Sequence, residues 1–249
     1  VIKLEDTSGG DYLRWMQPLV DEYSAMFHPL NRNKRSLAID LKSAQGRDAL
    51  LRLAASADVV IESFRPGVMD RLGIGFAALT AVNPRLVLCS ISGYGQDGPF
   101  RDRAGHDLNY AAVAGVLMLG GTADGVPAMP GLQVGDLGGG ALHAALAIMV
   151  ALHHAARTGR GQHCDAVPAC AVHRALVRLA EQHPDRAGAD RGARCHGFAA
   201  AQPRPHIWLP AVFPDARAVS PVPCRPPHPH GSAHGRADSP EHHALVAAA

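Results

Sequence analysis

Two short glycine-flanked segments carry side chains that could do chemistry. The first contains His106 and Asp107, and the second, 30 residues after His106, contains Asp136. Imidazole and carboxylate groups act as general acids and bases when their pKa values lie near the working pH. Flanking glycines let a ligand approach the backbone closely. Both segments precede apolar helical patterns whose N-termini favour negative charge, so a ligand site is one interpretation.

The same residues also have a purely structural interpretation. Asp107 or Asp136 could be an N-cap, because an aspartate before a helix accepts hydrogen bonds from its free backbone N–H groups. Both interpretations place the two aspartates at the beginning of helices, and the residue types leave both open.

Other chemical motifs are weak or absent from the sequence. The five cysteines are an odd number at irregular spacing, so we expect no disulfide scaffold. Cys164, Cys170 and His173 resemble part of a zinc site, but no paired CxxC accompanies them, and we expect no metal. No dinucleotide fingerprint, P-loop or GxSxG elbow is present in the sequence.

Alternating strand and helix patterns fill the first two thirds of the chain. Strands are predicted at 1–4, 36–41, 58–62, 85–91 and 162–167, and helices at 44–55, 69–72, 76–82, 107–117 and 141–156. This order predicts an α/β domain with a parallel sheet and ligands at the carboxyl ends of its strands. The helix at 141–156 is apolar almost all round, which predicts that it is buried, and 16 residues are short for a membrane span.

The composition changes at residue 168. The last 82 residues hold 12 of the 19 prolines and 9 of the 15 histidines, and about 16% of them are Leu, Ile, Val or Phe. Such a composition buries too little apolar surface to offset the entropy of ordering. We therefore expect domain boundaries of 1–167 for the folded part and 168–249 for a low-order tail. Two interpretations of the tail remain: the translation of an out-of-frame stretch of the gene, or a natural disordered extension. Residues 170–182 of the tail have one helical pattern.

The overall charge excludes some classes of partner. The chain has 24 Lys and Arg against 22 Asp and Glu, so it has no strongly basic surface for nucleic acid. No apolar run of membrane length and no secretory pattern at residues 1–5 are present, which predicts no membrane association and a cytoplasmic location.

The order of motifs resembles the family III CoA-transferases (the CaiB/BaiF-like superfamily), and within them the α-methylacyl-CoA racemases. The resemblance covers roughly residues 1–167. It rests on these segments: Lys34–Lys42, Ala57–Val68, Asn83–Leu86, Ser92–Gln96, Gly105–Tyr110, Asp136 with its glycines, and Thr158–Gln162. The fold that the resemblance implies is a Rossmann-like parallel sheet of the large domain, incomplete in this chain.

The resemblance also implies a set of site residues. His106 and Asp136 would be the two acid/base groups of a racemase, acting on the α-proton of a 2-methylacyl-CoA thioester. Coenzyme A would be held by residues from two parts of the chain: Ile39, Asp40, Leu41, Lys42, Arg71, Gly105, Asp107, Asn109 and Tyr110. No cofactor is expected, because coenzyme A is part of the substrate. The partners implied are the acyl-CoA and a second copy of the chain in a homodimer.

Two alternatives remain from the sequence. Family III transferases use the aspartate at position 136 as a nucleophile and generally lack the histidine, so a CoA-transferase with His106 as a bystander is the second hypothesis. The third is an inactive fragment. The resemblance implies about 30 further residues, a strand, a loop and a helix, before Val1, and a smaller domain after residue 167. In addition, Asp6 stands near the position of a CoA-contacting arginine in the racemases.

Overall fold

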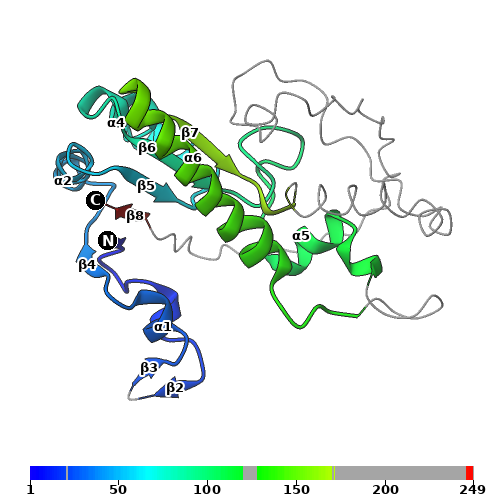
Figure 1. The fold of residues 1–249 in the computed structure, drawn as a ribbon. Helices are drawn as coiled ribbons and strands as arrows, with labels where there is room; N and C mark the ends of the chain where they lie inside the picture. The colour runs from blue at the N-terminus through cyan, green and yellow to red at the C-terminus, as the bar shows by residue number, and fades with distance from the viewer. Residues whose placement is uncertain (21, 120–127, 170, 172–244, 249) are drawn as a thin grey trace, which may run out of the picture. The chain divides into compact units, whose positions relative to one another are not determined.

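The computed structural model describes residues 1–20, 22–119, 128–169, 171 and 245–248 (Figure 1). The chain forms two compact units. The first comprises Val1–Ile91, Leu146–Cys164 and Ser239–Ala249, and the second comprises Ser92–Ala145 and Asp165–Asp238. The predicted helix at 170–182 lies outside the described residues. So does most of the predicted low-order tail, and the domain boundary at residue 167 stays a prediction.

A six-stranded sheet forms the centre of the fold. Its strands, in spatial order, are β4 (Arg35–Ala38), β1 (Ile2–Glu5), β8 (Leu245–Ala248), β5 (Val59–Glu62), β6 (Val87–Ile91) and β7 (His163–Ala166). β1 pairs with β4 and β5 pairs with β6 in parallel register, which confirms the α/β class with a parallel sheet. The order resembles that of a doubly wound sheet, in which two halves extend outward from a central strand.

The central strand differs from the rest of the sheet. β8 lies between β1 and β5 and is antiparallel to both, with Leu4 opposite Leu245 and Val60 opposite Ala247 (Figure 1). β1 and β5 are therefore joined through a strand from the far end of the sequence. This strand falls within residues 168–249, where the composition predicted low order.

Local sequence explains the helices that cover this sheet. Helix α2 (Ala44–Ala54) begins at the N-cap Ser43, whose Oγ accepts a hydrogen bond from the Gly46 N–H at 3.0 Å. Two short helices follow β5, namely α3 (Val68–Arg71) and α4 (Phe76–Val82). Together with the strands they enclose an apolar core of Leu4, Leu50, Ala54, Val60, Met69, Ile74, Leu79, Leu86 and Leu88.

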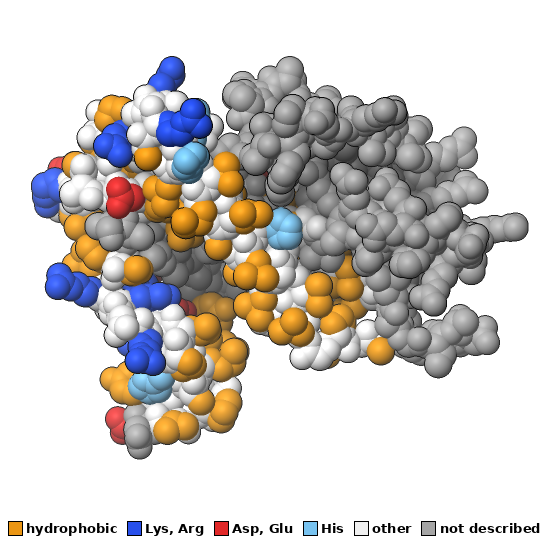
Figure 2. Space-filling view, in the orientation of Figure 1, with side chains coloured by type: hydrophobic (Ala, Val, Ile, Leu, Met, Phe, Trp, Pro, Cys, Tyr) orange, Lys and Arg blue, Asp and Glu red, His pale blue; other side chains and the backbone are white. Residues whose placement is uncertain are grey.

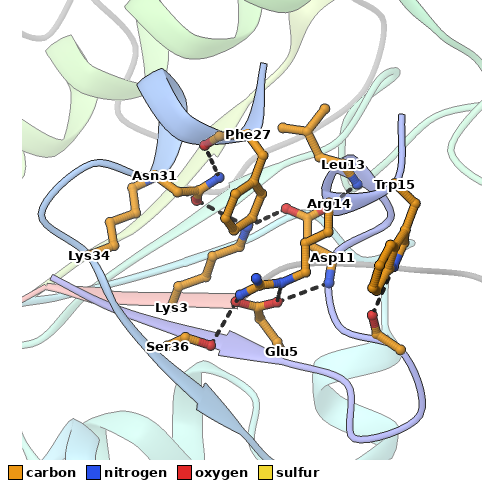
Figure 3. Close-up of polar contacts among 11 residues, drawn as sticks. Lys3, Glu5, Asp11, Leu13, Arg14, Trp15, Phe27, Asn31, Lys34 and Ser36 are labelled. Atoms are coloured by element: carbon orange, nitrogen blue, oxygen red, sulfur yellow. Dashed lines mark hydrogen bonds and ion pairs between the residues drawn. The ribbon is translucent and has the colours of Figure 1, made fainter. Parts of the chain in front are cut away.

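The segment between β1 and β4 contains elements that periodicity does not predict. These are the 3₁₀ turn η1 (Tyr12–Arg14), the hairpin strands β2 (Leu19–Val20) and β3 (Tyr23–Ser24), and the short helix α1 (Phe27–Asn31). Polar contacts fix this segment to β1, because buried Glu5 accepts two hydrogen bonds from Arg14, each 2.8 Å long (Figure 3). A second contact of the same kind joins buried Lys3 of β1 to Asp11 of this segment.

The described part of the second unit contains several helical elements. Helix α5 (Asp107–Val113) is followed by a 3₁₀ turn, η2 (Val116–Leu119). The π-helix η3 (Val134–Leu142) then continues directly into α6 (His143–Thr158). π-Helical turns are rare and are frequently found at functional sites. Helix α5 ends at Val113, four residues before the predicted end at 117, because Gly115 has a positive φ of 85°.

The prediction that the 141–156 helix is buried is wrong for three of its large side chains, Leu142, Leu146 and Met149, which are exposed. Ala144, Ala151 and Ala155 are buried, whereas Leu146 is 48% and Met149 65% exposed. The small residues make the packed face because they let backbones approach closely. Figure 2 shows the resulting hydrophobic side chains along α6.

The continuous helix of η3 and α6 is also longer than the sequence suggested. It runs over 25 residues, Val134–Thr158, and by length and composition alone it could cross a membrane. Core helices of soluble proteins pass the same test.

Candidate functional site

The two predicted acid/base residues lie at the starts of two helices that touch each other. His106 is the N-cap of α5, with extended backbone, and Asp136 lies in the first turn of η3. A side chain links the two segments, because Asp107 Oδ1 accepts a hydrogen bond from the backbone N–H of Asp136 at 2.7 Å. The two sequence segments singled out above therefore meet in space.

Close backbone approach accompanies this link. A methyl group added at Gly135 would lie 3.0 Å from Asp107 Oδ1 and 3.2 Å from the Asp107 carbonyl oxygen. Gly135 itself is buried. An alanine at 135 would fit only if Asp107 or Tyr110 moved by a few tenths of an ångström, so Gly135 favours the close approach of η3 to α5.

The carboxyl group of Asp136 has an electrostatic environment suited to proton transfer. Its pKa is raised, chiefly by burial and next by the negative charge of Asp107, while the charge of His106 acts in the opposite direction. The effect of His106 places the imidazole and the carboxyl in one electrostatic neighbourhood. A raised pKa brings a carboxyl nearer to neutral pH, where it can both accept and release a proton.

Tyr110 packs under the His106 segment. Its hydroxyl donates a short hydrogen bond to the carbonyl oxygen of Gly105. Its ring occupies space that only glycine leaves free, since a methyl group on Gly93 would overlap the ring and one on Gly105 would lie 2.7 Å from Cε1. The ring of Tyr94 meets it edge-on, with 5.2 Å between centroids. Burial, with smaller contributions from Asp136 and Tyr94, raises the pKa of Tyr110 to about 12.

Asn109 acts on the same peptide from the other side. Its Oδ1 accepts a hydrogen bond from the backbone N–H of His106 at 3.0 Å. Asn109 and Tyr110, both predicted to contact coenzyme A, thus direct polar side-chain atoms toward the backbone around His106. Their predicted contacts with coenzyme A remain predictions.

The other predicted CoA contacts belong to the first unit. Ile39–Lys42 connects β4 to α2, and Arg71 ends α3, which follows β5. β4 and β5 run in the same direction, because β1 is parallel to β4 and both β1 and β5 are antiparallel to β8. Both segments therefore leave the carboxyl edge of the sheet, the edge at which α/β proteins bind ligands.

The side chains of this connection differ in what they offer a ligand. Ile39 and Leu41 pack against the apolar core. Asp40 accepts hydrogen bonds from Lys42 N and Ser43 Oγ, which fixes the turn before α2. Lys42 and Arg71 are exposed cations, suited to phosphate groups.

Sequence reasoning missed two features of the site. It considered Asp107 as an N-cap, whereas His106 is the N-cap and the Asp107 side chain accepts a hydrogen bond from Asp136 N; the predicted contact of Asp107 with coenzyme A stays a prediction. It also gave no role to Gly93, which lies beneath the Tyr110 ring. The closeness of Asp107 and Asp136 to helix starts is the one sequence signal that could have suggested the bond between them. In the described part of the chain, no group of three His, Cys, Asp or Glu side chains could hold a metal ion.

Comparison with known proteins identifies the family of the chain. The sequence profile described as CoA-transferase family III matches residues 1–203. The chain belongs to this family. The match extends beyond residue 167, at which the resemblance of individual motifs ends.

Relatives within the family have different activities. The chain is 40% identical to the succinate–glutarate CoA-transferase of Agrobacterium fabrum over 172 residues, 66% of this chain and 43% of that protein. It is 47% identical to the α-methylacyl-CoA racemase of Mus musculus over 136 residues, 55% of this chain and 36% of that protein.

A solved structure of the family has a similar fold. It is a CaiB/BaiF family protein from Brucella suis, with a TM-score of 0.68 and 37% identity over 75% of this chain and 50% of that one. The chain thus spans about half the length of the solved structure and less than half that of the curated relatives. The two curated relatives are a CoA-transferase and an acyl-CoA racemase by name, and the activity of this chain is the subject of the next subsection.

Proposed function

We propose that this family III member moves the α-proton of a 2-methylacyl-CoA thioester, as an α-methylacyl-CoA racemase. The observation that carries the proposal is that the helix starts bearing His106 and Asp136 are joined by the hydrogen bond from Asp136 N–H to Asp107 Oδ1. Inverting a carbon centre needs a base on one face and an acid on the other. An imidazole and a carboxyl can fill both roles, and burial raises the pKa of the Asp136 carboxyl toward neutrality.

The reaction would proceed through an enolate. The thioester carbonyl acidifies the neighbouring C–H bond, so one of the two residues removes that proton and the electron pair moves onto the carbonyl oxygen. The other residue then protonates the opposite face of the α-carbon. Neutral His106 and ionised Asp136 would serve as bases toward opposite epimers, and their roles would exchange with each turnover.

The exposed cations of the first unit complete the proposal. Lys42 and Arg71 would meet the phosphates of coenzyme A at the carboxyl edge of the sheet. The other predicted contacts are the backbone of Ile39–Leu41 and the segment Gly105–Tyr110. A homodimer and a cytoplasmic location belong to the same proposal.

A family III CoA-transferase is the second candidate. It is favoured by the transferase relatives, which include the one from Agrobacterium fabrum. In that reaction Asp136 would attack the thioester carbonyl and release the CoA thiolate, forming an acyl–aspartyl anhydride. The thiolate would then attack the aspartyl carbonyl and release the first acid. A second carboxylate would attack the resulting aspartyl thioester, forming a second acyl–aspartyl anhydride and releasing the CoA thiolate. That thiolate would attack the acyl carbonyl of this anhydride, which gives the new acyl-CoA and regenerates the Asp136 carboxylate.

Isotope exchange separates the two candidates. The chain is incubated with each epimer of a 2-methylacyl-CoA in deuterium oxide, and deuterium at the α-carbon is measured by mass spectrometry. We expect exchange from both epimers, with His106→Gln slowing one epimer and Asp136→Asn the other. His153→Gln, at an exposed position of α6, is the matched control and should exchange at the original rate.

Chemical trapping provides the opposite test. Hydroxylamine added with acyl-CoA would convert an acyl–aspartyl or aspartyl–CoA intermediate into a hydroxamate, detectable on the peptide containing Asp136. A racemase forms neither intermediate. Trapping that persists in His106→Gln, together with absence of α-exchange, would refute the racemase and support the transferase.

A further inference from the structure

One peptide unit of the candidate site is held at both of its polar ends. The carbonyl oxygen of Gly105 accepts the hydroxyl hydrogen of Tyr110, and the N–H of His106 donates to Asn109 Oδ1. These two atoms belong to the single peptide bond that joins Gly105 to His106. Both partners come from α5, the helix that this peptide precedes.

The Tyr110 ring cannot shift without disturbing its surroundings. Gly93 and Gly105 lie against it so closely that a methyl group on either would collide with it. Tyr94 packs edge-on against it and in turn contacts the ring of Phe100, with 5.8 Å between centroids. The hydroxyl is therefore aimed by packing as well as by its hydrogen bond.

Tyr110 also touches the segment that carries Asp136. A methyl group added at Gly135 would lie 3.3 Å from Tyr110 Cβ. One residue of α5 thus contacts the backbone on both sides of the site: the peptide before His106 and the glycine before Asp136. The carboxylate of Asp107 closes the arrangement through its bond to Asp136 N.

The His106 side chain is exposed, and His106 is the N-cap of α5 in a capping box with Asn109. The backbone that carries the imidazole therefore helps to aim it. A rotation of the Gly105–His106 peptide would swing the ring relative to Asp136. Positional errors of about 1 Å in a catalytic group can lower the rate roughly a hundredfold.

We propose that Tyr110 and Asn109 are positioning residues that clamp the Gly105–His106 peptide and so set the place of the His106 imidazole beside Asp136. This inference rests on the proposed function, because it gives the clamp a role in proton transfer. It assigns the tyrosine hydroxyl and the asparagine amide oxygen to the protein backbone, so any contact of these residues with coenzyme A would be made by their other atoms.

Conservative variants isolate the two bonds of the clamp. Tyr110→Phe keeps the ring and removes the hydroxyl, and Asn109→Leu removes the acceptor at similar volume, whereas Asn109→Asp keeps an acceptor oxygen. Tyr12→Phe is the matched control, because it removes the hydroxyl of an exposed tyrosine in the first unit. Thermal unfolding of each variant verifies that the chain folds.

The first readout does not depend on activity. Histidine Cε1–H signals are recorded by NMR on the 249-residue chain, and the His106 signal is assigned with His106→Gln. We expect that signal to move in Tyr110→Phe and Asn109→Leu by more than any other histidine signal, and to stay in place in Tyr12→Phe. A His106 signal that is unmoved in both clamp variants would overturn the inference, whatever reaction the enzyme catalyses.

The second readout is the α-proton exchange of 2-methylacyl-CoA. We expect kcat to fall about 10- to 100-fold in the two clamp variants with KM changed less than about twofold, and Asn109→Asp to recover most of the loss. A rise in KM at unchanged kcat would mean that Tyr110 or Asn109 contacts the substrate and would overturn the clamp. If the original chain shows no exchange, the proposed reaction fails and the NMR result alone decides the inference.

Discussion

The buried carboxylate of Glu5 makes stability depend on pH in a way that can be calculated. Glu5 lies on β1 and is 5% exposed. It accepts hydrogen bonds from Arg14, from the backbone N–H of Asp11 at 3.0 Å and from Ser36 Oγ at 2.8 Å (Figure 3). These bonds, those from Arg14 above all, lower the pKa of Glu5 from 4.5 to about 2, against the opposing effect of burial.

The lowered pKa has a definite sign and size. Because the folded chain holds the ionised form more tightly than the unfolded chain, the stabilisation is present above pH 4.5 and is lost as pH falls toward 2. A difference of about 2.5 units corresponds to about 3.4 kcal/mol at pH 7 and about 1.4 kcal/mol at pH 3. Screening at the partly exposed Arg14 lowers the neutral-pH figure to about 2 to 3 kcal/mol.

The substitution that tests this is Glu5→Gln. Glutamine keeps the size of the side chain, loses the charge that Arg14 and Asp11 N–H contact, and does not titrate. We expect urea unfolding at pH 7, followed by circular dichroism, to show a loss of about 2 to 3 kcal/mol. At pH 3 the difference between the two proteins should fall to about 1 kcal/mol.

The matched control is Asp48→Asn, which neutralises an exposed carboxylate on α2. Its unfolding free energy should stay within about 0.5 kcal/mol of the original at both pH values. The reasoning would be refuted if Glu5→Gln unfolded at the original urea concentration at pH 7. It would also be refuted if the deficit of Glu5→Gln grew as the pH fell.

Three further predictions concern the site and the sheet. Asp107→Asn keeps an acceptor for Asp136 N–H and removes a negative charge, so the pKa of Asp136 should fall, as measured by carboxyl NMR titration. Deletion of residues 245–249 removes β8 and should raise hydrogen exchange of the amides of β1 and β5 at least tenfold, since each strand loses a hydrogen-bonded neighbour. Gly161→Ala should lower stability by about 2 kcal/mol in urea unfolding, because the added methyl collides with the Leu86 carbonyl.

Each of these predictions has a control and a contrary outcome. Asp102→Asn, at an exposed position of the same unit, should leave the Asp136 titration in place, and an unmoved titration in Asp107→Asn would contradict the electrostatic argument. Unchanged exchange in the truncated chain would mean that β8 does not hold the sheet together. Gly131→Ala meets open space, so a loss equal to that of Gly161→Ala would exclude the steric explanation.

Elements with strong local signals were predictable from the sequence. The helix after Ser43 occupies Ala44–Ala54 because its N-cap and apolar spacing act within a few residues. The run Val59–Glu62 begins with three β-branched residues, a pattern that also acts locally, and it forms a largely buried strand. The pairing of His106 with Asp136 was predicted from the order of motifs in a known family, and the structure brings their segments together.

Contacts between distant residues could be decided only by the tertiary structure. The bond from Asp136 N to Asp107, the fit of the Tyr110 ring over Gly93 and the insertion of β8 between β1 and β5 each join residues far apart in the sequence or on separate elements. The outward position of Leu146 and Met149 belongs with them, since an all-round apolar helix does not specify which face packs.

The physical reason is the range of the interactions involved. Caps and apolar periodicity depend on neighbours within one or two turns, so the sequence by itself determined the type and approximate bounds of most elements in residues 1–167. Which elements meet, and which side chain bonds which backbone group, depends on packing and on hydrogen-bond partners that the folded chain alone brings together. For this protein the sequence determined the chemistry available at His106 and Asp136, and the tertiary structure decided how their backbones are held.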